Sequence, residues 1–212
     1  MKIKIFVFNI ISVNTFILYD DTHEAVIIDC GCLKADEQTA LTDFIKDNKL
    51  IVKHLLNTHL HMDHAFGNTF AAQTFGLQPE GNRLDETELP PLQQQAARFG
   101  IQINDPAIPF GSYLDDGDTV SFGLNTLHCL HVPGHSPGSL AFYSPEAACV
   151  FSGDVLFQGS IGRTDLWGGD FNTLIAGIRN KLLTLPDHTT VYPGHGSPTT
   201  IGEEKRFNRY LR

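Results

Sequence analysis

Four side chains that commonly bind metal ions lie close together in this chain. Segment 58–64 reads THLHMDH, which places His59, His61, Asp63 and His64 in the pattern H-x-H-x-D-H. Imidazole nitrogens combined with a carboxylate, and with no thiolate, suit zinc, iron or manganese. Single histidines are common on protein surfaces, but three of them with an aspartate at this spacing form a specific motif. We therefore predict a metal site here rather than a polar loop with surface histidines.

Three further residues repeat the same local arrangement elsewhere in the chain. His135, Asp154 and His195 each follow a stretch that reads as a strand, and a glycine directly precedes each of them. Glycine lets the backbone turn sharply and approach a neighbour closely, which helps to aim a ligand into a shared cleft. Together with the first motif, these residues give five histidines and two aspartates. That set is sufficient for two adjacent metal ions with an open position for water.

The elements that must position these residues are predicted from apolar patterning. Residues 51–57 are mostly β-branched and aliphatic, and residues 64–76 have helical composition, so the first motif lies between a strand and a helix. The opening strands, with a turn at residues 20–23, form an antiparallel meander. In chain order we expect strands at 2–8, 14–19, 25–30, 51–57, 119–122, 126–132, 139–143, 147–152 and 189–192, helices at 35–48, 64–76 and 171–185, and a short helix at the end. The order predicts an α/β fold with two mixed sheets packed together and helices outside, a four-layer αββα sandwich.

The apolar pattern that predicts strands and helices weakens between residues 77 and 111. Five prolines interrupt this segment, and only residues 93–99 read as a short helix. An insertion of this kind beside a metal loop is typical of a lid or a substrate wall. The alternative is a surface excursion with no role in the site.

Composition limits the classes of function. The chain of 212 residues is long enough for a sizeable core, and we expect one domain over residues 1–212. Its formal net charge of −9 argues against a nucleic-acid partner, which needs a basic face. The apolar N-terminus is broken by polar residues without a cleavage site for a signal peptide, and no apolar run is long enough to cross a bilayer. We expect a cytoplasmic protein that binds neither nucleic acid nor membranes.

The four cysteines lack the spacing of a zinc finger, and a chain of this length does not need disulfides. Buried free thiols are the expected state for Cys30, Cys32, Cys129 and Cys149. Cys30 and Cys32, separated by one glycine, are alternatively a redox pair.

The motifs and the strand pattern together resemble the metallo-β-lactamase superfamily, in particular glyoxalase II (hydroxyacylglutathione hydrolase) and its short single-domain relatives. The resemblance extends over essentially the whole chain. It implies that one metal ion is bound by three histidines and the other by an aspartate and two histidines, with one aspartate bridging both. The first ion would be held by His59, His61 and His135, the second by Asp63, His64 and His195, and the bridge would be Asp154. Asp29 matches a position whose carboxylate supports the site from behind the ligands.

Substrate recognition is implied by the segment after Asp154. Residues 156–165 are similar to the glyoxalase II segment that leads to a basic residue in contact with glutathione, and Arg163 falls on that position. A guanidinium there can bind a carboxylate with two hydrogen bonds. The alternative is a structural salt bridge from Arg163 to Asp165 or Asp170. Asp165 stands where many members have an aromatic contact, and the chain ends where full-length glyoxalase II enzymes continue into a helical glutathione-binding domain.

The resemblance implies a dinuclear hydrolase of thioesters, with S-lactoylglutathione or a similar acyl thiol as substrate. The cofactor would be two divalent metal ions, zinc first and iron or manganese as alternatives. Metal coordination lowers the pKa of water from about 15.7 to about 7, so that neither Ser nor Cys need serve as nucleophile. Asp63 and Asp154 would orient the attacking oxygen as well as bind metal.

Other functions on the same fold remain open. A non-haem iron persulfide dioxygenase shares the fold and most of the motifs, and lactone or β-lactam hydrolysis uses similar metal chemistry. A non-catalytic binding domain would lack some ligands, whereas all of them are present. The five remaining histidines are expected to be structural: His23, His54, His128, His131 and His188.

Overall fold

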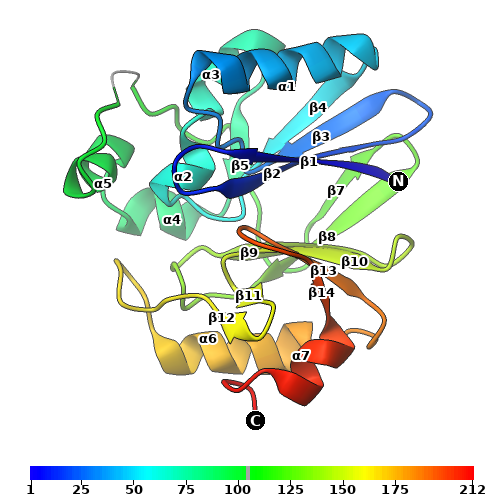
Figure 1. Cartoon of the computed structure of the whole chain (residues 1–212), viewed down its shortest axis with the longest axis vertical. Coiled ribbons are helices and arrows are strands. Elements are labelled where there is room, and N and C mark those ends of the chain that lie inside the picture. Colours follow the sequence, from blue (N-terminus) through cyan, green and yellow to red (C-terminus); the bar gives the residue numbers. More distant parts are fainter. Residues whose placement is uncertain (104–105) are drawn as a thin grey trace.

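The first sheet is built from the N-terminal half of the chain. The computed structural model describes residues 1–103 and 106–212, and Figure 1 shows two sheets face to face between helical layers. The strands of this sheet follow the chain order β1-β2-β3-β4-β5-β6. The first three are antiparallel, as predicted, and the last three join in parallel, which makes the sheet mixed. Its strands are β1 (Lys2–Phe8), β2 (Val13–Tyr19), β3 (Glu24–Ile28), β4 (Ile51–Leu56), β5 (Pro79–Gly81) and β6 (Ser112–Tyr113).

The second sheet is also mixed and comes from the C-terminal half. Its order is β14-β13-β10-β9-β8-β7, with a parallel pair between β10 and β13 and antiparallel pairs elsewhere. Its strands are β7 (Thr119–Phe122), β8 (Asn125–His131), β9 (Leu140–Ser144), β10 (Cys149–Gly153), β13 (Thr190–Pro193) and β14 (Thr199–Thr200). A separate hairpin pairs β11 (Leu156–Phe157) with β12 (Ser160–Ile161).

Three apolar clusters show how the four layers pack. Alternation along the strands of each sheet sends one set of side chains inward, so that Phe16 and Phe151 meet between the sheets with their ring centroids 5.0 Å apart. The opposite face of the first sheet packs on α1 (Ala35–Asp47) through Leu41 and Ile45. The outer face of the second sheet is covered by α6 (Phe171–Gly177), the π-helical turn η1 (Ile178–Leu182) and α7 (Ile201–Phe207). The predicted αββα sandwich is therefore confirmed.

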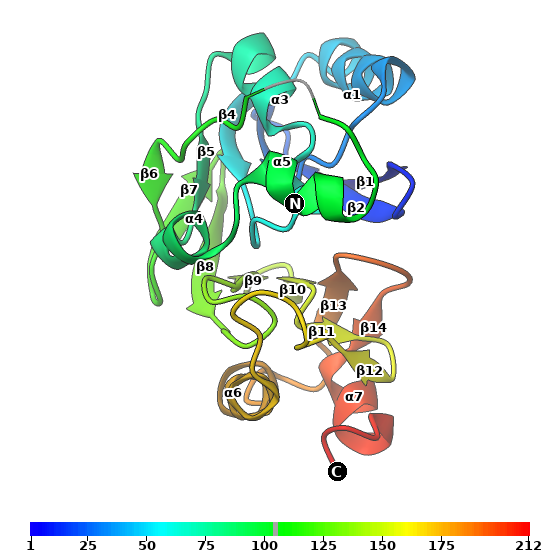
Figure 2. The same cartoon turned by 90° about the vertical axis from the view of Figure 1, so that its left-hand side faces the viewer.

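Short helices gather at one edge of the sandwich. Figures 1 and 2 show α2 (Met62–Ala65), α4 (Arg83–Glu88) and α5 (Leu92–Arg98) there, beside the ends of strands from both sheets. The predicted helix over 64–76 is instead two helices, α2 and α3 (Asn68–Phe75). They separate at Gly67, whose N–H donates to the carbonyl of Cys30 and where a side chain would collide with the thiols of Cys30 and Cys32.

The remaining differences from the predicted elements are small. Helix α2 begins at Met62 rather than at His64, which places Asp63 inside a helical turn rather than in the preceding loop. The weak segment 77–111 contains β5, α4 and α5, of which only α5 was predicted, and residues 104–105 lie outside the described residues. No helix in the described part of the chain is long and apolar enough to cross a membrane. All four cysteines are free and buried.

Candidate metal centre

The structure brings the seven predicted metal-binding side chains together at one edge of the sandwich. His59 and His61 lie in the loop after β4, and Asp63 and His64 lie in α2. His135, Asp154 and His195 follow β8, β10 and β13 of the other sheet. Three sets of three side chains have ligand atoms within 4.8 Å of one another. We name the first the trihistidine group (His59, His61 and His135) and the second the mixed group (Asp63, His64 and His195). The third set, His59, His64 and Asp154, shares one histidine with each of the other two.

The trihistidine group converges through one nitrogen of each ring. His61 Nδ1 and His135 Nε2 are 2.9 Å apart, and His135 Nε2 lies 3.2 Å from His59 Nε2. Tetrahedral zinc with Zn–N bonds of 2.0–2.1 Å holds pairs of nitrogens roughly 3.3 Å apart. The spacing of the three nitrogens is therefore close to that of a metal site.

The mixed group contains the carboxylate of Asp63. Its Oδ2 lies 3.1 Å from His195 Nε2 and 3.6 Å from His64 Nε2. Asp154 stands between the two groups, with one carboxylate oxygen 3.4 Å from His64 Nε2 and the other 3.8 Å from His135 Nε2. Asp154 therefore lies within 3.8 Å of ring nitrogens from both groups, and its bridging role stays a prediction.

Buried polar atoms without partners show that a cation fits here. Among the described residues, His64 Nε2 and Asp154 Oδ1 are buried and accept or donate no hydrogen bond. Buried polar groups are normally satisfied, and an unsatisfied one costs about 1–3 kcal/mol. A metal ion bound by both atoms would remove that cost. The donor set of imidazoles and carboxylates suits zinc, iron or manganese equally well.

The outward nitrogens of His135 and His195 are fixed by carbonyl oxygens. His135 Nδ1 lies 2.8 Å from the carbonyl oxygen of Arg163, and His195 Nδ1 lies 3.1 Å from that of Ser12. A carbonyl oxygen only accepts, so each Nδ1 carries a proton and each Nε2 is the nitrogen that faces the cluster. Such outer contacts orient metal-binding histidines in proteins.

Asp29 lies directly behind the cluster, as the sequence predicts. Its carboxylate accepts from His64 Nδ1 at 2.9 Å, from the backbone N–H of Thr58 at 2.7 Å and from the Thr58 hydroxyl at 2.6 Å. The Thr58 hydroxyl is also 3.0 Å from His59 Nδ1. Asp29 is fully buried and has a φ of +53°, so its backbone conformation is itself unusual for a residue other than glycine.

Two glycines allow the loops of the second sheet to reach the cluster. Gly153 has a φ of +50°, a left-handed conformation that glycine adopts readily, and it directs Asp154 toward α2. A side chain on Gly194 would collide with the Asp154 carboxylate and the His64 ring. The main chain of β2 holds the same loop from the other sheet, since Asn14 N–H donates to the Gly194 carbonyl at 2.6 Å.

The electrostatic environment differs between the two groups. Burial, and then the other imidazoles, lowers the pKa of His59 well below its usual value. Burial likewise lowers the pKa of His61 to about 3 and depresses that of His135. The trihistidine group is therefore neutral at pH 7 and presents lone pairs rather than protons.

The mixed group is dominated by carboxylates. Burial by itself would lower the pKa of His64, but Asp63, Asp154 and Asp29 together raise it well above the ordinary value. Burial acts to raise the pKa of both Asp63 and Asp154, yet the nearby His64 outweighs it and holds both below the usual range. This group attracts positive charge, either as protons on its imidazoles or as a metal ion.

A cleft of about 360 Å³ opens onto both groups. Apolar side chains supply much of its wall, among them Met62, Phe99 and Trp167. The Trp167 ring lies 6.5 Å from the His61 ring and under the guanidinium of Arg98, at 5.6 Å. Sequence reasoning missed Trp167, although the only tryptophan of the chain, followed by two glycines, was a usable signal.

Arg163 also lines this cleft, but it is paired. Its Nε and one terminal nitrogen donate to the two oxygens of Asp165 at 2.7 and 2.8 Å. The two side chains are 54% and 69% exposed, so solvent weakens the pair and a ligand carboxylate can compete for the guanidinium. The salt bridge to Asp165 that the sequence offered as an alternative is present, and substrate binding by Arg163 stays a prediction.

The other five histidines join no metal-binding group in the described part of the chain. His54 is paired with Glu80 at 2.7 Å, which raises its pKa, and His131 Nε2 lies 2.8 Å from the Pro137 carbonyl. Their expected structural role agrees with these contacts.

Comparisons with known proteins place these observations in context. The model of the metallo-β-lactamase superfamily matches residues 10–195. The hydroxyacylglutathione hydrolase GloC of Haemophilus influenzae is 40% identical over 212 residues, covering 100% of this chain and 98% of that protein. Two crystal structures are also similar, each with a TM-score of 0.86. The B3 metallo-β-lactamase BLEG-1 is 37% identical and covers 99% of both chains, and TTHA1623 in a di-iron-bound form is 36% identical and covers 98% and 100%.

Proposed function

Because the chain belongs to the metallo-β-lactamase superfamily, we propose that it is a dinuclear metal-dependent hydrolase of thioesters of the S-lactoylglutathione type. The observation that carries the proposal is the convergence of seven side chains from four separate segments on one cleft. The similarity to a hydroxyacylglutathione hydrolase over the whole chain supports the choice of substrate.

The two groups divide the metal-binding roles. The trihistidine group would hold one ion, the mixed group the other, and Asp154 would contact both, because its carboxylate lies within 3.8 Å of ring nitrogens from both groups. Ions bound in this way would lower the pKa of a water molecule toward neutrality and polarise the acyl carbonyl. Zinc is the first choice of metal, and iron is the alternative because a similar protein has a di-iron-bound form.

The residues of the chain then position the water and the acyl group. Asp63 and Asp154 each place an oxygen within 3.6 Å of His195 Nε2. Their pKa values lie below the ordinary range, so both are ionised at neutral pH and would accept hydrogen bonds from a water molecule placed between them. That contact would orient a lone pair of the water toward the cleft, where Met62, Phe99 and Trp167 would shelter the acyl chain from solvent.

No thiol of the second sheet is available as a nucleophile. Burial raises the pKa of Cys129 to about 12 and that of Cys149 to about 11, so both remain protonated at neutral pH. Arg163 lies at the cleft wall and is half-exposed. We propose that it releases Asp165 and binds a carboxylate of the thiol carrier instead.

A thioester panel on the metal-quantified protein tests the proposal. We expect hydrolysis of S-lactoylglutathione, weaker turnover of the same acyl group on coenzyme A, and loss of both metal and activity in His61→Ala. Full activity of His61→Ala would refute the site. Stoichiometric iron together with oxygen uptake on a persulfide would show that the protein is a dioxygenase rather than a hydrolase. Turnover of a β-lactam or a lactone, with no turnover of thioesters, would show that the proposed substrate is wrong.

A further inference from the structure

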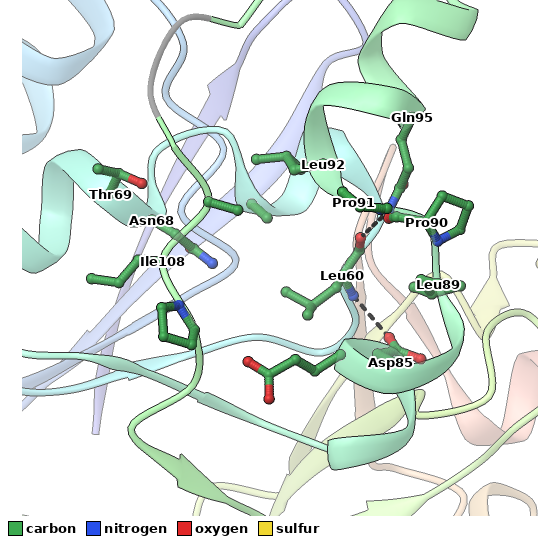
Figure 3. A pocket seen from close by; sticks show the side chains of 14 residues that line it. Leu60, Asn68, Thr69, Asp85, Leu89, Pro90, Pro91, Leu92, Gln95 and Ile108 are labelled. Carbon is green, nitrogen blue, oxygen red and sulfur yellow. Dashed lines mark hydrogen bonds between the residues drawn. The ribbon is translucent and has the colours of Figure 1, made fainter.

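Two residues of the weakly patterned segment 77–111 form hydrogen bonds to the backbone of the metal-binding loop. Leu60 lies between His59 and His61, and both of its backbone polar groups are held by side chains of that segment. Its N–H donates to Asp85 Oδ2 at 2.8 Å, and its carbonyl accepts from Gln95 Nε2 at 3.0 Å. Figure 3 shows these two hydrogen bonds meeting at Leu60 from α4 and α5.

Asp85 also holds the loop that carries His135. The Ser136 hydroxyl donates to its Oδ2 at 3.0 Å, and the Gly138 N–H donates to its Oδ1 at 2.5 Å. One carboxylate thus joins the two loops that together supply the whole trihistidine group. Asp85 and Gln95 are 1% and 2% exposed, so neither is a surface contact.

Stability does not explain a carboxylate at this position. Asp85 forms no ion pair with any residue that the structure describes, and burial raises its pKa to about 6. Burying an unpaired carboxylate costs free energy, and apolar replacements of buried charged groups are often neutral or stabilising. What the carboxylate provides is a fixed set of three hydrogen bonds.

Packing behind the loop is also incomplete. A cavity of about 280 Å³ lies against Leu60, with apolar lining from residues 89–92 and 107–109 and polar side chains from α3 and α4. Close packing normally restrains a loop, and an adjacent cavity leaves room for it to shift. The hydrogen bonds of Asp85 and Gln95 therefore have to supply the restraint.

We propose that Asp85 and Gln95 are positioning residues that fix the separation of the three ring nitrogens of the trihistidine group. The inference rests on the proposed metal-binding role of that group, and it assigns segment 77–111 a function beyond that of a lid or a substrate wall. In the part of the chain that the structure describes, neither side chain is hydrogen-bonded to the mixed group, whose supports are Asp29 and the carbonyl of Ser12.

Metal affinity of the two sites tests this proposal directly. Chelator-stripped protein is titrated with Zn²⁺ alone, in competition with a chromophoric chelator, for wild type, Asp85→Asn and Gln95→Leu. Outer contacts of metal ligands typically contribute about 10–100-fold in affinity. We expect a loss of that size at one of two sites in each variant, with the other site unchanged.

Double variants identify which of the two metal sites is affected. In His195→Ala, which weakens the mixed group, Asp85→Asn should still reduce the remaining affinity by about 10–100-fold. In His61→Ala, which removes a donor of the trihistidine group, Asp85→Asn should leave the remaining affinity unchanged. If Asp85→Asn fails to fold, Gln95→Leu carries the same comparison.

Glu204→Gln is the matched control. Glu204 is a buried carboxylate that also accepts three hydrogen bonds, from Gly159, Thr199 and Asn208, and it touches none of the seven metal-binding side chains. It should lower thermal stability without altering zinc affinity. Asp85 and Gln95 variants that behave in the same way, or that weaken both sites equally, would overturn the proposal. Wild type that binds two zinc ions without hydrolysing thioesters would instead refute the proposed function alone.

Discussion

The two halves of the candidate metal centre are held in place by different means. The trihistidine group contains no carboxylate, and its rings stay neutral because burial lowers their pKa values. The mixed group is bound together by charge, with Asp63 and Asp154 raising the pKa of His64. A neutral group depends on the scaffold for its geometry, whereas a charged group is organised partly by attraction among its own members. Scaffold changes should therefore affect the first half more, and charge changes the second.

Removing the shared carboxylate should have the largest effect. Asp154→Ala takes away the one side chain that faces both halves, so we expect both metal affinities to fall and thioester turnover to drop by at least about 10³-fold. This exceeds the roughly 10–100-fold expected for an outer contact. Metal content and turnover, measured on the same sample, check the prediction. A variant that retains one fully occupied site would show that the halves are independent.

Replacing Asp29 should lower the metal affinity of one half more than that of the other. Asp29→Asn keeps an asparagine in the left-handed backbone conformation, which asparagine tolerates, but offers one acceptor oxygen to three donors. We expect a loss of about 10–100-fold in metal affinity, mainly in the mixed group that contains His64. Zinc titration in the same two backgrounds measures it. A loss confined to the trihistidine group would contradict the distinction drawn between the halves.

The sequence allowed the metal-binding residues and the layers to be predicted because both leave strong local patterns. The H-x-H-x-D-H motif and the glycines before Asp154 and His195 are short-range signals, and strand alternation reveals the two sheets. Asp85, Gln95 and Trp167 carry no such signal. Asp85 reads as an ordinary acidic residue in a short helix, and only the tertiary fold shows that it meets Leu60 and Ser136. The two-residue strands were missed for the same reason, since too few residues are present to show alternation.

The pH dependence of stability contributed by His61 and by His64 should have opposite signs in the metal-free protein. Between pH 6.5 and about 3, unfolded His61 binds a proton that the native residue does not, so its contribution to the free energy of unfolding falls as pH falls. His64 has a raised pKa, so its contribution is complete below about pH 6.5 and is lost as pH rises.

Urea unfolding of chelator-stripped variants measures both slopes. His61→Gln should reduce the slope of the free energy of unfolding against pH below pH 6.5, by up to about 1.4 kcal/mol per pH unit. His64→Gln should reduce the slope of the same curve above pH 6.5. Equal changes in both variants, or a change in the wrong pH range, would show that the two groups have the same electrostatic character.

The smallest effect is expected outside both halves. Cys129 and Cys149 lie in the cluster between the sheets and contact no metal-binding side chain. Cys129→Ala and Cys149→Ala should leave turnover within about twofold of wild type while reducing stability by roughly 1 kcal/mol. Thermal unfolding and thioester turnover test this. A large loss of turnover at unchanged stability would indicate that a thiol takes part in the reaction.

The most direct test of the account is a crystal structure of the metal-loaded protein with anomalous scattering to locate the ions. We predict two ions roughly 3.5–4 Å apart. One should be bound by the trihistidine group and one by the mixed group, with Asp154 bound to both. A single ion, or a pair that leaves Asp154 or His195 uncoordinated, would contradict the dinuclear centre.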